Sequence, residues 1–428
     1  MTARPLPKSL YADTARPAAP APLLQGDRTV SVAIVGGGFT GLSTALHLAQ
    51  AGTDVAVLEA HEPGWGASGR NGGQVNPGLK HDPDAILRDF GPEMGRRMIR
   101  LSGGAPQAVF DLVREHQIQC EAHQGGTIRA AYHQAGFAEI SAGASQQIRQ
   151  GAPVELLDAE AMRGMTGSGR YVGGLIDRRG GNVNPLGYAR GLADAAQRAG
   201  AAIHGGSPVT RVVREDGRWA VSTPTGTLRA EQLVLCTNGY TDNLWPGLRR
   251  SVVPVFSAIA ATEPLPEALA RSIMPTRSVL YEIASITVYY RLDAWNRLLM
   301  GGRSALHDTS DPQEYSYRRL IRYSETLWPQ LKGVRWEHFW NGQLAITPDH
   351  YPHLHEPAPG VIAALGYNGR GVAMATAMGR QIARRILSPG AELDMPVTDL
   401  KPIPFHALWR SAVAARVTYG RIRDMLGV

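Results

Sequence analysis

An unbroken apolar segment that runs into a glycine-rich turn constrains this chain more than any other feature. Residues 30–35 read VSVAIV, as expected of a buried parallel strand. The next residues, GGGFTG at 36–41, lead into a segment with apolar residues at helical spacing, which Gly52 would end. A second apolar strand at 55–58 then ends at Glu59. This order of elements predicts a Rossmann-type dinucleotide site.

The glycines of this turn have distinct expected roles. Gly36 would permit the tight strand-to-helix turn, Gly38 would let backbone approach a pyrophosphate, and Gly41 would allow close packing of helix on strand. The helix N-terminus offers unpaired N–H groups and partial positive charge to phosphate. Glu59 stands where it could accept hydrogen bonds from a ribose. We therefore favour a cofactor site over a purely structural turn.

A second glycine-rich segment bears on which dinucleotide is bound. Residues 64–74 read GWGASGRNGGQ and follow the second strand on the ligand side of an α/β sheet. Such a segment exposes backbone N–H groups, and Arg70 adds a fork of donors; a flexible surface loop is the alternative. A nicotinamide needs no such segment, whereas a broad tricyclic ring needs backbone that passes flat along it. The sequence therefore favours a flavin.

Together the two segments resemble the D-amino-acid oxidase-like superfamily of FAD-dependent oxidoreductases. Within it, the chain looks most like the gamma-glutamylputrescine oxidase group, which also includes enzymes that oxidise cyclic and secondary amino acids. The resemblance runs from about Tyr11 to the C-terminus. It includes GGNVNP at 180–185, the strand and turn at 233–240, YYRL at 289–292 and GYNGRG at 366–371.

The resemblance implies an α/β fold with FAD as cofactor. It implies a Rossmann-type FAD-binding domain, discontinuous in sequence, with an interleaved α+β substrate domain built on a mixed sheet. Val209 would lie at the adenine, with an ordinary strand valine as the alternative. The expected catalytic residues are Tyr290, Arg291, Trp340 and Tyr367. The expected cofactor contacts are Gly36, Gly38, Phe39, Thr40, Gly41, Glu59, Ala60, Ala67, Ser68, Arg70, Asn71, Gly72, Gly73, Gln74, Val209, Thr237, Asn238, Gly239, Gly366, Asn368, Gly369, Arg370, Gly371 and Val372.

The cofactor segments divide the chain into an alternating series. We expect an extended N-terminal arm at 1–29, FAD-binding segments at 30–84, 176–249 and 355–390, substrate-domain segments at 85–175 and 250–354, and a C-terminal tail with a terminal helix at 391–428. The substrate domain should be a mixed sheet with helices covering the flavin face.

Local patterns predict individual elements of this plan. Asn184 and Pro185 read as the N-cap and first residue of a helix. The segments 289–292 and 297–302 read as a hairpin, with Trp336, Phe339 and Trp340 on a neighbouring strand. Alternation should send some of these aromatic side chains to a substrate cavity and others to the core.

The apolar strand at 361–365 predicts a second helix N-terminus at the cofactor. It leads through the glycines at 366–371 into a segment of helical period. A helix N-terminus would stabilise the negative charge of a reduced flavin, with Arg370 either adding to this or facing solvent.

An amine substrate would need little acid–base machinery. Only the neutral amine reacts, and deprotonating an alkylamine at pH 7 costs about 4 kcal/mol, which an apolar pocket can reduce by desolvation. Accordingly no His/Asp dyad is required. His338, His350, His353 and His355 lack the spacing of a metal site or a hydrolase, so we expect no metal and treat them as structural.

One segment bears on the substrate. Relatives that oxidise small alpha-amino acids often carry a carboxylate-binding arginine shortly after the glycine equivalent to Gly342, whereas here residues 342–349 read GQLAITPD. This favours an amine with a distant carboxylate, such as a gamma-glutamyl group. An amino acid whose carboxylate meets Arg291 or Arg70 instead is the alternative.

Composition bounds the remaining alternatives. The formal net charge of +7 is spread without basic runs, so we expect no nucleic-acid partner. The cysteines, Cys120 and Cys236, cannot make a disulfide framework, and no signal peptide or transmembrane segment is apparent, so we expect a cytoplasmic protein. Residues 408–428 suggest a docked terminal helix, or alternatively a membrane-surface helix that passes electrons to quinone.

We therefore expect an FAD-dependent enzyme that oxidises the C–N bond of an amine to an imine and aldehyde with release of ammonia. The expected substrate is gamma-glutamylputrescine or a related polyamine derivative, with dioxygen as acceptor. A secondary or cyclic amino-acid oxidase, of the L-pipecolate or sarcosine type, is the second reading. A flavin-binding or interaction protein without turnover is the third.

Overall fold

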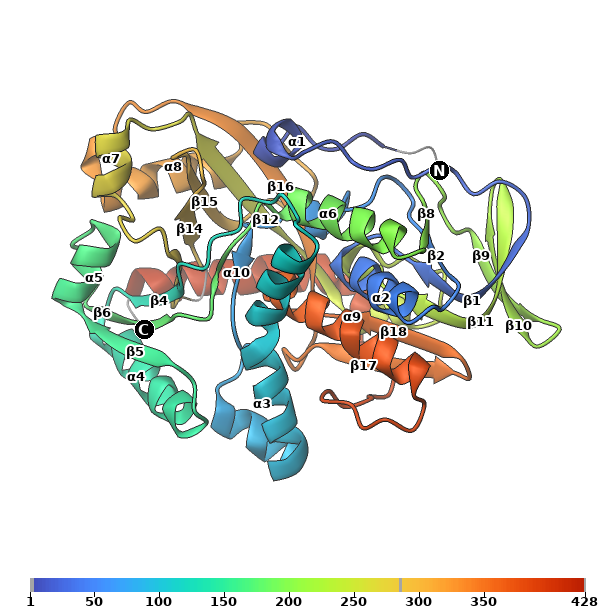
Figure 1. The fold of residues 1–428 in the computed structure, drawn as a ribbon. Coiled ribbons are helices and arrows are strands. Elements are labelled where there is room, and N and C mark those ends of the chain that lie inside the picture. The colour runs from blue at the N-terminus through green and yellow to red at the C-terminus, as the bar shows by residue number, and fades with distance from the viewer. Residues whose placement is uncertain (1–3, 285–286, 427–428) are drawn as a thin grey trace.

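Two eight-stranded sheets form the framework of the chain, which the computed structural model describes for residues 4–284 and 287–426 (Figure 1). Neighbouring strands from β18 to β8 of the first sheet are parallel, while β17 pairs antiparallel at its edge. The order is β17 (His353–Ala358), β18 (Val361–Leu365), β11 (Gly226–Leu235), β1 (Arg28–Val35), β2 (Val55–Leu58) and β8 (Ala202–His204), with β10 (Arg218–Thr223) and β9 (Arg211–Glu215) branching from β11.

The register of the first sheet brings three strand ends together. Val35 of β1 lies opposite Leu58 of β2 on one side and Leu235 of β11 on the other. Because the strands are parallel, the residues that follow them, Gly36 and Glu59 among them, emerge at the same edge. The sheet thus positions the glycine turn and the acidic residue side by side.

Helices cover one face of this sheet. Apolar side chains of the strands, such as Val32 and Val234, share a core with α2 (Phe39–Gln50), α3 (Pro83–Glu115), α6 (Pro185–Arg198) and α9 (Gly371–Leu387). The predicted helix start at Pro185 is confirmed, because the side chain of Asn184 accepts a hydrogen bond from the Gly187 N–H at 3.1 Å. The other face packs beneath the β9–β10 ribbon, around Trp219 and Val221.

The second sheet is mixed, as the sequence predicts. Its order is β16 (Trp336–Ile346), β12 (Val253–Thr262), β15 (Leu298–Arg303), β14 (Tyr289–Leu292), β13 (Val279–Glu282), β4 (Thr127–Ala131), β6 (Gly173–Asp177) and β5 (Val154–Asp158). The pairing of β13 with β4 is parallel and the other pairings are antiparallel. The hairpin of β14 and β15 is confirmed, but β12 separates it from β16, so the strand with Trp336 and Trp340 is not its direct neighbour.

Helices flank both faces of the second sheet rather than only one. Helices α5 (Ala159–Thr166), α7 (Glu267–Ser272) and α8 (Tyr315–Leu327) pack on the face that carries Ala258, Tyr290 and Met300. Helix α4 (Gln134–Arg149) packs on the opposite face, against Ala131. Helix α4 lies on the face whose side chains line the ligand cavity, and α5, α7 and α8 do not line it. Of these four helices, only α4 is therefore placed as expected of a helix that covers the flavin.

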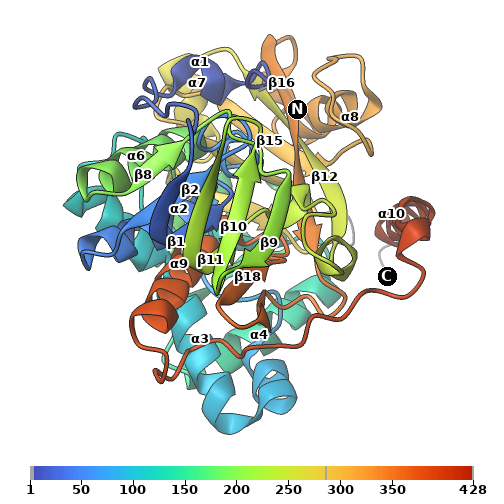
Figure 2. The same cartoon turned by 90° about the vertical axis from the view of Figure 1, so that its right-hand side faces the viewer.

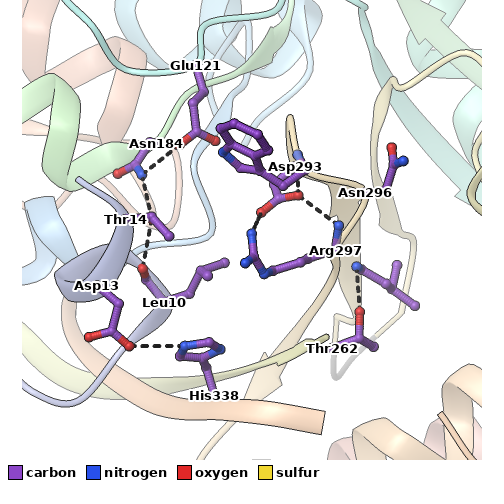
Figure 3. A network of polar contacts seen from close by, with 12 residues as sticks. Leu10, Asp13, Thr14, Glu121, Asn184, Thr262, Asp293, Asn296, Arg297 and His338 are labelled. Carbon is purple, nitrogen blue, oxygen red and sulfur yellow. Dashed lines mark hydrogen bonds and ion pairs between the residues drawn. The ribbon is translucent and has the colours of Figure 1, made fainter. Parts of the chain in front are cut away.

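The N-terminal arm crosses the surface and carries a short helix, α1 (Leu10–Thr14), with Leu10 and Tyr11 buried. Figure 3 shows how α1 is attached to both parts of the fold. Asp13 lies 3.1 Å from the imidazole of His338 on β16, and Asn184 donates to the Thr14 hydroxyl at 3.2 Å. The N-terminal arm is thus mostly extended, and its short helix attaches it to β16 and to the start of α6.

The C-terminal tail ends in α10 (Trp409–Leu426), which stands at the edge of the molecule after an extended segment (Figure 2). None of the helices within residues 4–284 and 287–426 combines the length and apolar character that crossing a bilayer requires. A two-stranded sheet of β3 (Gln74–Val75) and β7 (Gly181–Asn182) completes the strands.

The chain passes from one sheet to the other close to the expected segment boundaries, but two of these boundaries fall within or beside a strand. Strand β6 of the second sheet runs to Asp177, and β17 of the first sheet begins at His353. We retain the division into segments as a proposal, with these strands crossing two of its limits.

Candidate functional site

A cavity of about 1560 Å³ is lined by residues from both sheets. Ligand pockets for single small molecules usually measure about 300–1,000 Å³. The cavity is therefore large enough for a dinucleotide together with a second small molecule. Its walls include the ends of β1 and β2, the residues that follow β11, the segment after β2, several residues of β12 and part of α10.

The glycine turn after β1 is held by close backbone contacts. Gly36 has φ +107°, and a Cβ there would lie 2.7 Å from the carbonyl oxygen of Cys236. A Cβ on Gly41 would lie 2.0 Å from the carbonyl oxygen of Gly36. Gly38, in an extended conformation, is the N-cap of α2 and provides no side-chain cap, so the helix N-terminus opens toward the cavity.

Glu59 lies at the cavity wall with its carboxylate partly satisfied by backbone. It accepts hydrogen bonds from the N–H groups of Gly37 at 2.7 Å and His61 at 3.0 Å. Burial raises the pKa of this carboxyl, and these hydrogen bonds oppose the rise. A carboxylate has about four lone-pair sites, so acceptor capacity remains for ribose hydroxyls.

The segment after β2 folds back against the N-terminus of α2. The Ser68 hydroxyl accepts a hydrogen bond from the Phe39 N–H at 3.0 Å. The buried guanidinium of Arg70 stacks 4.0 Å from the Trp65 ring centre and donates to the Trp65 carbonyl at 2.8 Å. Arg70 also pairs with Asp308 at 3.3 Å. These contacts fix the segment at the wall of the cavity.

The turn between β18 and α9 forms the facing wall. Asn238 accepts a hydrogen bond from the Gly366 N–H at 3.0 Å. The Tyr367 hydroxyl lies 2.6 Å from the Thr40 hydroxyl, which joins this turn to the N-terminus of α2. Arg370 is the N-cap of α9 and provides no side-chain cap either. The N-termini of α2 and α9 thus open onto one cavity, a placement suited to a group with negative charge.

Replacing Tyr367 by phenylalanine should lower the free energy of unfolding by about 1 kcal/mol, because the Thr40 hydroxyl loses its buried partner. Chemical denaturation of the purified protein measures this change. Tyr419→Phe is the matched control, because Tyr419 is exposed on α10, and it should leave stability unchanged. Equal stability of Tyr367→Phe and the parent protein would contradict the role assigned to this bond.

Arg370 faces the cavity rather than solvent. Its guanidinium donates to the Pro77 carbonyl at 2.6 Å and to the Tyr281 hydroxyl at 3.0 Å. Burial acts to raise the pKa of Tyr281, but the positive charges of Arg370, Arg129 and Lys80 outweigh it and lower that pKa. A tyrosine with a perturbed pKa in a cavity is typical of a functional site.

Most of the expected cofactor contacts line the cavity. Gly41, Gly73, Gly239 and Gly366 do not, and the space around them is filled by protein. A Cβ on Gly73 would lie 2.2 Å from the Val183 carbonyl oxygen, for example. The residues that line the cavity are Gly36, Gly38, Phe39, Thr40, Glu59, Ala60, Ala67, Ser68, Arg70, Asn71, Gly72, Gln74, Val209, Thr237, Asn238, Asn368, Gly369, Arg370, Gly371 and Val372.

Three of the four expected catalytic residues do not line the cavity, and the fourth does. Tyr290 is fully buried on the face of the second sheet that packs against α8. Trp340 is fully buried and donates to the Arg70 carbonyl at 2.9 Å. Arg291 is 2% exposed and donates to backbone and side-chain acceptors of the interior. Tyr367 does line the cavity.

Strand alternation explains why Tyr290 does not line the cavity. Because successive side chains point to opposite faces, Tyr289 rather than Tyr290 faces the cavity. Its hydroxyl lies 2.8 Å from the Ser257 hydroxyl on β12. The YYRL segment signalled an aromatic residue at the site, but its local pattern did not say which tyrosine.

Other lining residues gave weaker sequence signals. Tyr240 lies in the turn after β11, Tyr281 lies within β13, and Arg303 ends β15. On α10 the cavity is lined by Trp409, Val413 and Val417, whose spacing marks one helical face. These apolar side chains face the protein, which favours the docked-helix alternative for the terminal segment.

Comparison with known proteins assigns the family. The family model described as "FAD dependent oxidoreductase" (DAO) matches residues 31–385. The chain belongs to this family. The DAO family uses FAD, and the chain is an FAD-dependent oxidoreductase.

Relatives of known name are similar over nearly the full length. "Gamma-glutamylputrescine oxidoreductase" of Escherichia coli (strain K12) is 34% identical over 425 residues, which cover 98% of this chain and 99% of that protein. "Probable oxidoreductase OrdL" of Rhizobium meliloti (strain 1021) is 32% identical over 380 residues, 87% of each chain. The resemblance inferred from the motifs is confirmed.

Solved structures share the fold. Glycine oxidase from Geobacillus kaustophilus superposes with a TM-score of 0.73 and 21% identity, covering 85% of this chain and 96% of that one. L-proline dehydrogenase from P. horikoshii gives a TM-score of 0.71 at 19% identity, covering 86% and 96%. The discontinuous α/β domain with its mixed-sheet partner is the fold of these flavoenzymes.

The residues present fit FAD. The N-termini of α2 and α9 open onto the cavity, and neither N-cap residue supplies a side-chain cap. Ser68 engages the Phe39 N–H of α2, and phosphate oxygens are suitable partners for other N–H groups at these helix ends. Glu59 keeps acceptor capacity for a ribose, as described above. A Cβ on Gly38 would meet the Ser68 hydroxyl at 2.9 Å, so glycine leaves room for Ser68 to contact the N-terminus of α2.

Proposed function

We propose that the protein oxidises the C–N bond of a primary amine at the end of a polyamine derivative, with gamma-glutamylputrescine as the substrate and dioxygen as the electron acceptor. The name of the full-length Escherichia coli relative supports this substrate. So does the segment 342–349, which lines the cavity through Gln343 and Leu344 and contains no arginine. That segment is the observation on which the proposal chiefly depends.

The proposed reaction balances as an oxidation by two electrons. The amine loses a hydride from carbon and a proton from nitrogen, and water hydrolyses the resulting imine to an aldehyde and ammonia. Dioxygen takes up the two electrons with two protons and leaves as hydrogen peroxide. FAD, when bound, supplies the electron-accepting group for the substrate.

The chain's own contribution is a binding site that favours the neutral amine. Val255, Ile259 and Tyr289 present apolar surface to the cavity from the second sheet. Desolvation by such a wall lowers the pKa of an alkylamine, which otherwise costs about 4 kcal/mol to deprotonate at pH 7. Thus no general base is required of the described side chains for this step.

The amino-acid alternative loses its two expected carboxylate partners. Arg291 is enclosed by interior acceptors and does not line the cavity. Arg70 lines the cavity, but its guanidinium is stacked on Trp65 and paired with Asp308. Neither arginine that the sequence offered for the carboxylate of a small amino acid is therefore free to bind it.

Anaerobic reduction of the bound flavin tests the proposal. The purified holoenzyme is mixed without oxygen with gamma-glutamylputrescine, N-acetylputrescine, L-pipecolate or sarcosine, and its visible absorbance is followed. We expect rapid bleaching by gamma-glutamylputrescine and hydrogen peroxide formation once air is admitted. Bleaching by the amino acids alone would favour the second reading, and bleaching by no amine would favour a protein without turnover.

The cellular location stays a proposal. Cys120 and Cys236 are buried free thiols, and burial raises the pKa of the Cys120 thiol to about 12. Inert thiols of this kind are compatible with the reducing cytoplasm expected from the sequence.

A further inference from the structure

Arg303 is a partly buried cation without a counter-charge. It ends β15 and lines the cavity, and among the described residues no hydrogen bond or ion pair engages its guanidinium. Removing a charge from water without pairing it is costly. A guanidinium kept in this position therefore indicates a partner that comes from outside the chain.

A second guanidinium approaches from another element. Arg416 on α10 lines the same cavity and lies over the Tyr419 ring, 5.9 Å from its centre. Burial, and then the positive charge of Arg416, lower the pKa of the Arg303 guanidinium. Two cations that repel each other across a cavity are stabilised together by an anion between them.

The acidic side chains that line the cavity are engaged elsewhere. Glu59 accepts from backbone N–H groups, and Glu139 pairs with Arg129 at 2.9 Å. Glu282 accepts from Tyr171 at 2.7 Å, and Asp242 accepts from the Leu244 N–H at 2.9 Å. Within the described chain, none of them acts on Arg303.

The wall beside Arg303 carries two hydroxyl groups, those of Ser257 and Tyr289. Ser257 lies opposite Arg303 in the pairing of β12 with β15. Its hydroxyl donates to the Gly302 carbonyl at 2.9 Å and lies 2.8 Å from the Tyr289 hydroxyl. The polar patch thus adjoins the apolar wall of Val255 and Ile259, as a ligand with one charged end requires.

We propose that Arg303 and Arg416 bind the carboxylate of an amino-acid head group at the far end of the amine substrate. A guanidinium matches a carboxylate through paired N–H···O bonds, which a lysine cannot reproduce. The inference rests on the proposed function for the identity of the substrate, because a gamma-glutamyl amide carries such a carboxylate remote from the reacting carbon. It assigns substrate specificity to residues outside the segment 342–349.

Kinetics with two amines that differ in the head group test this site. Gamma-glutamylputrescine carries the carboxylate, whereas N-acetylputrescine keeps the amine and the amide without it. Arg303→Gln should raise the KM for gamma-glutamylputrescine about 10- to 100-fold with little change in kcat. It should leave the KM for N-acetylputrescine unchanged.

Two further variants separate charge from folding. Arg416→Gln, at an exposed position, should raise the same KM about 2- to 5-fold. Arg303→Lys should recover part of the affinity, because it keeps charge but not the fork geometry. The matched control is Arg318→Gln on α8, an exposed arginine away from the cavity, which should change neither KM.

A binding measurement distinguishes failure of this site from failure of the proposed function. N5-butyl-L-glutamine carries the head group but no terminal amine, and calorimetry measures its affinity directly. Tight binding that Arg303→Gln weakens at least about 10-fold supports the site even if gamma-glutamylputrescine is not oxidised. No binding by the parent protein, equal binding by the variant, or equal KM changes for both amines would overturn it.

Discussion

Replacing Gly41 by alanine is expected to yield protein that is strongly destabilised and fails to retain FAD. The added Cβ would lie 2.0 Å from the carbonyl oxygen of Gly36, which belongs to backbone and cannot rotate away. Helix α2 would have to shift from β1, at a cost of about 3 kcal/mol or more. The shift would also displace the N-terminus of α2 from the cofactor. Thermal unfolding and the flavin absorbance per mole of protein measure the two effects.

Gly104→Ala provides a control with the opposite sign. Gly104 lies within α3, and a Cβ there would meet nothing within 4 Å. Alanine should therefore stabilise the protein by about 0.5–1 kcal/mol through its better helix propensity. If both variants unfolded like the parent and kept full FAD content, close packing at Gly41 would not be a requirement of the site.

The cofactor half of the site was predictable because its determinants are local. The turn at 36–41 and the acid at 59 lie within one strand–helix–strand unit, where glycine positions and strand lengths set the geometry directly. The segment at 64–74 follows immediately. For such a unit, spacing along the chain determines distances in space, with few contributions from remote residues.

The substrate half depends on pairings between distant segments. Whether Tyr289 or Tyr290 faces the cavity is decided by the register of β14 with β15 and by which face α8 covers. A shift of one residue exchanges the two faces of a strand. Arg303 and Arg416 meet the same cavity from β15 and α10, more than a hundred residues apart in the sequence. The residue pattern within either segment alone does not show that the two arginines line the same cavity.

Replacing Arg291 by methionine is expected to destabilise the protein by about 3–5 kcal/mol rather than to slow a reaction step. The guanidinium donates to the Gly72 carbonyl at 2.8 Å and, at longer distance, to the Tyr11 hydroxyl and the Val183 carbonyl. Methionine fills similar volume but leaves these buried acceptors without donors. Because Gly72 lines the cavity, FAD content should fall as well. Denaturant unfolding and flavin absorbance measure both changes.

Tyr11→Phe removes one hydrogen bond of this network and helps to distinguish a structural role of Arg291 from a catalytic one. It removes the hydroxyl that accepts from Arg291, and stability should fall by only about 1 kcal/mol with FAD content retained. A graded loss of stability across the two variants, with turnover per bound flavin nearly constant, follows from a structural Arg291. An Arg291→Met protein that unfolds like the parent and keeps its flavin, yet loses turnover, would contradict the structural role. It would show that Arg291 takes part in the reaction even though it is buried beneath the cofactor segment.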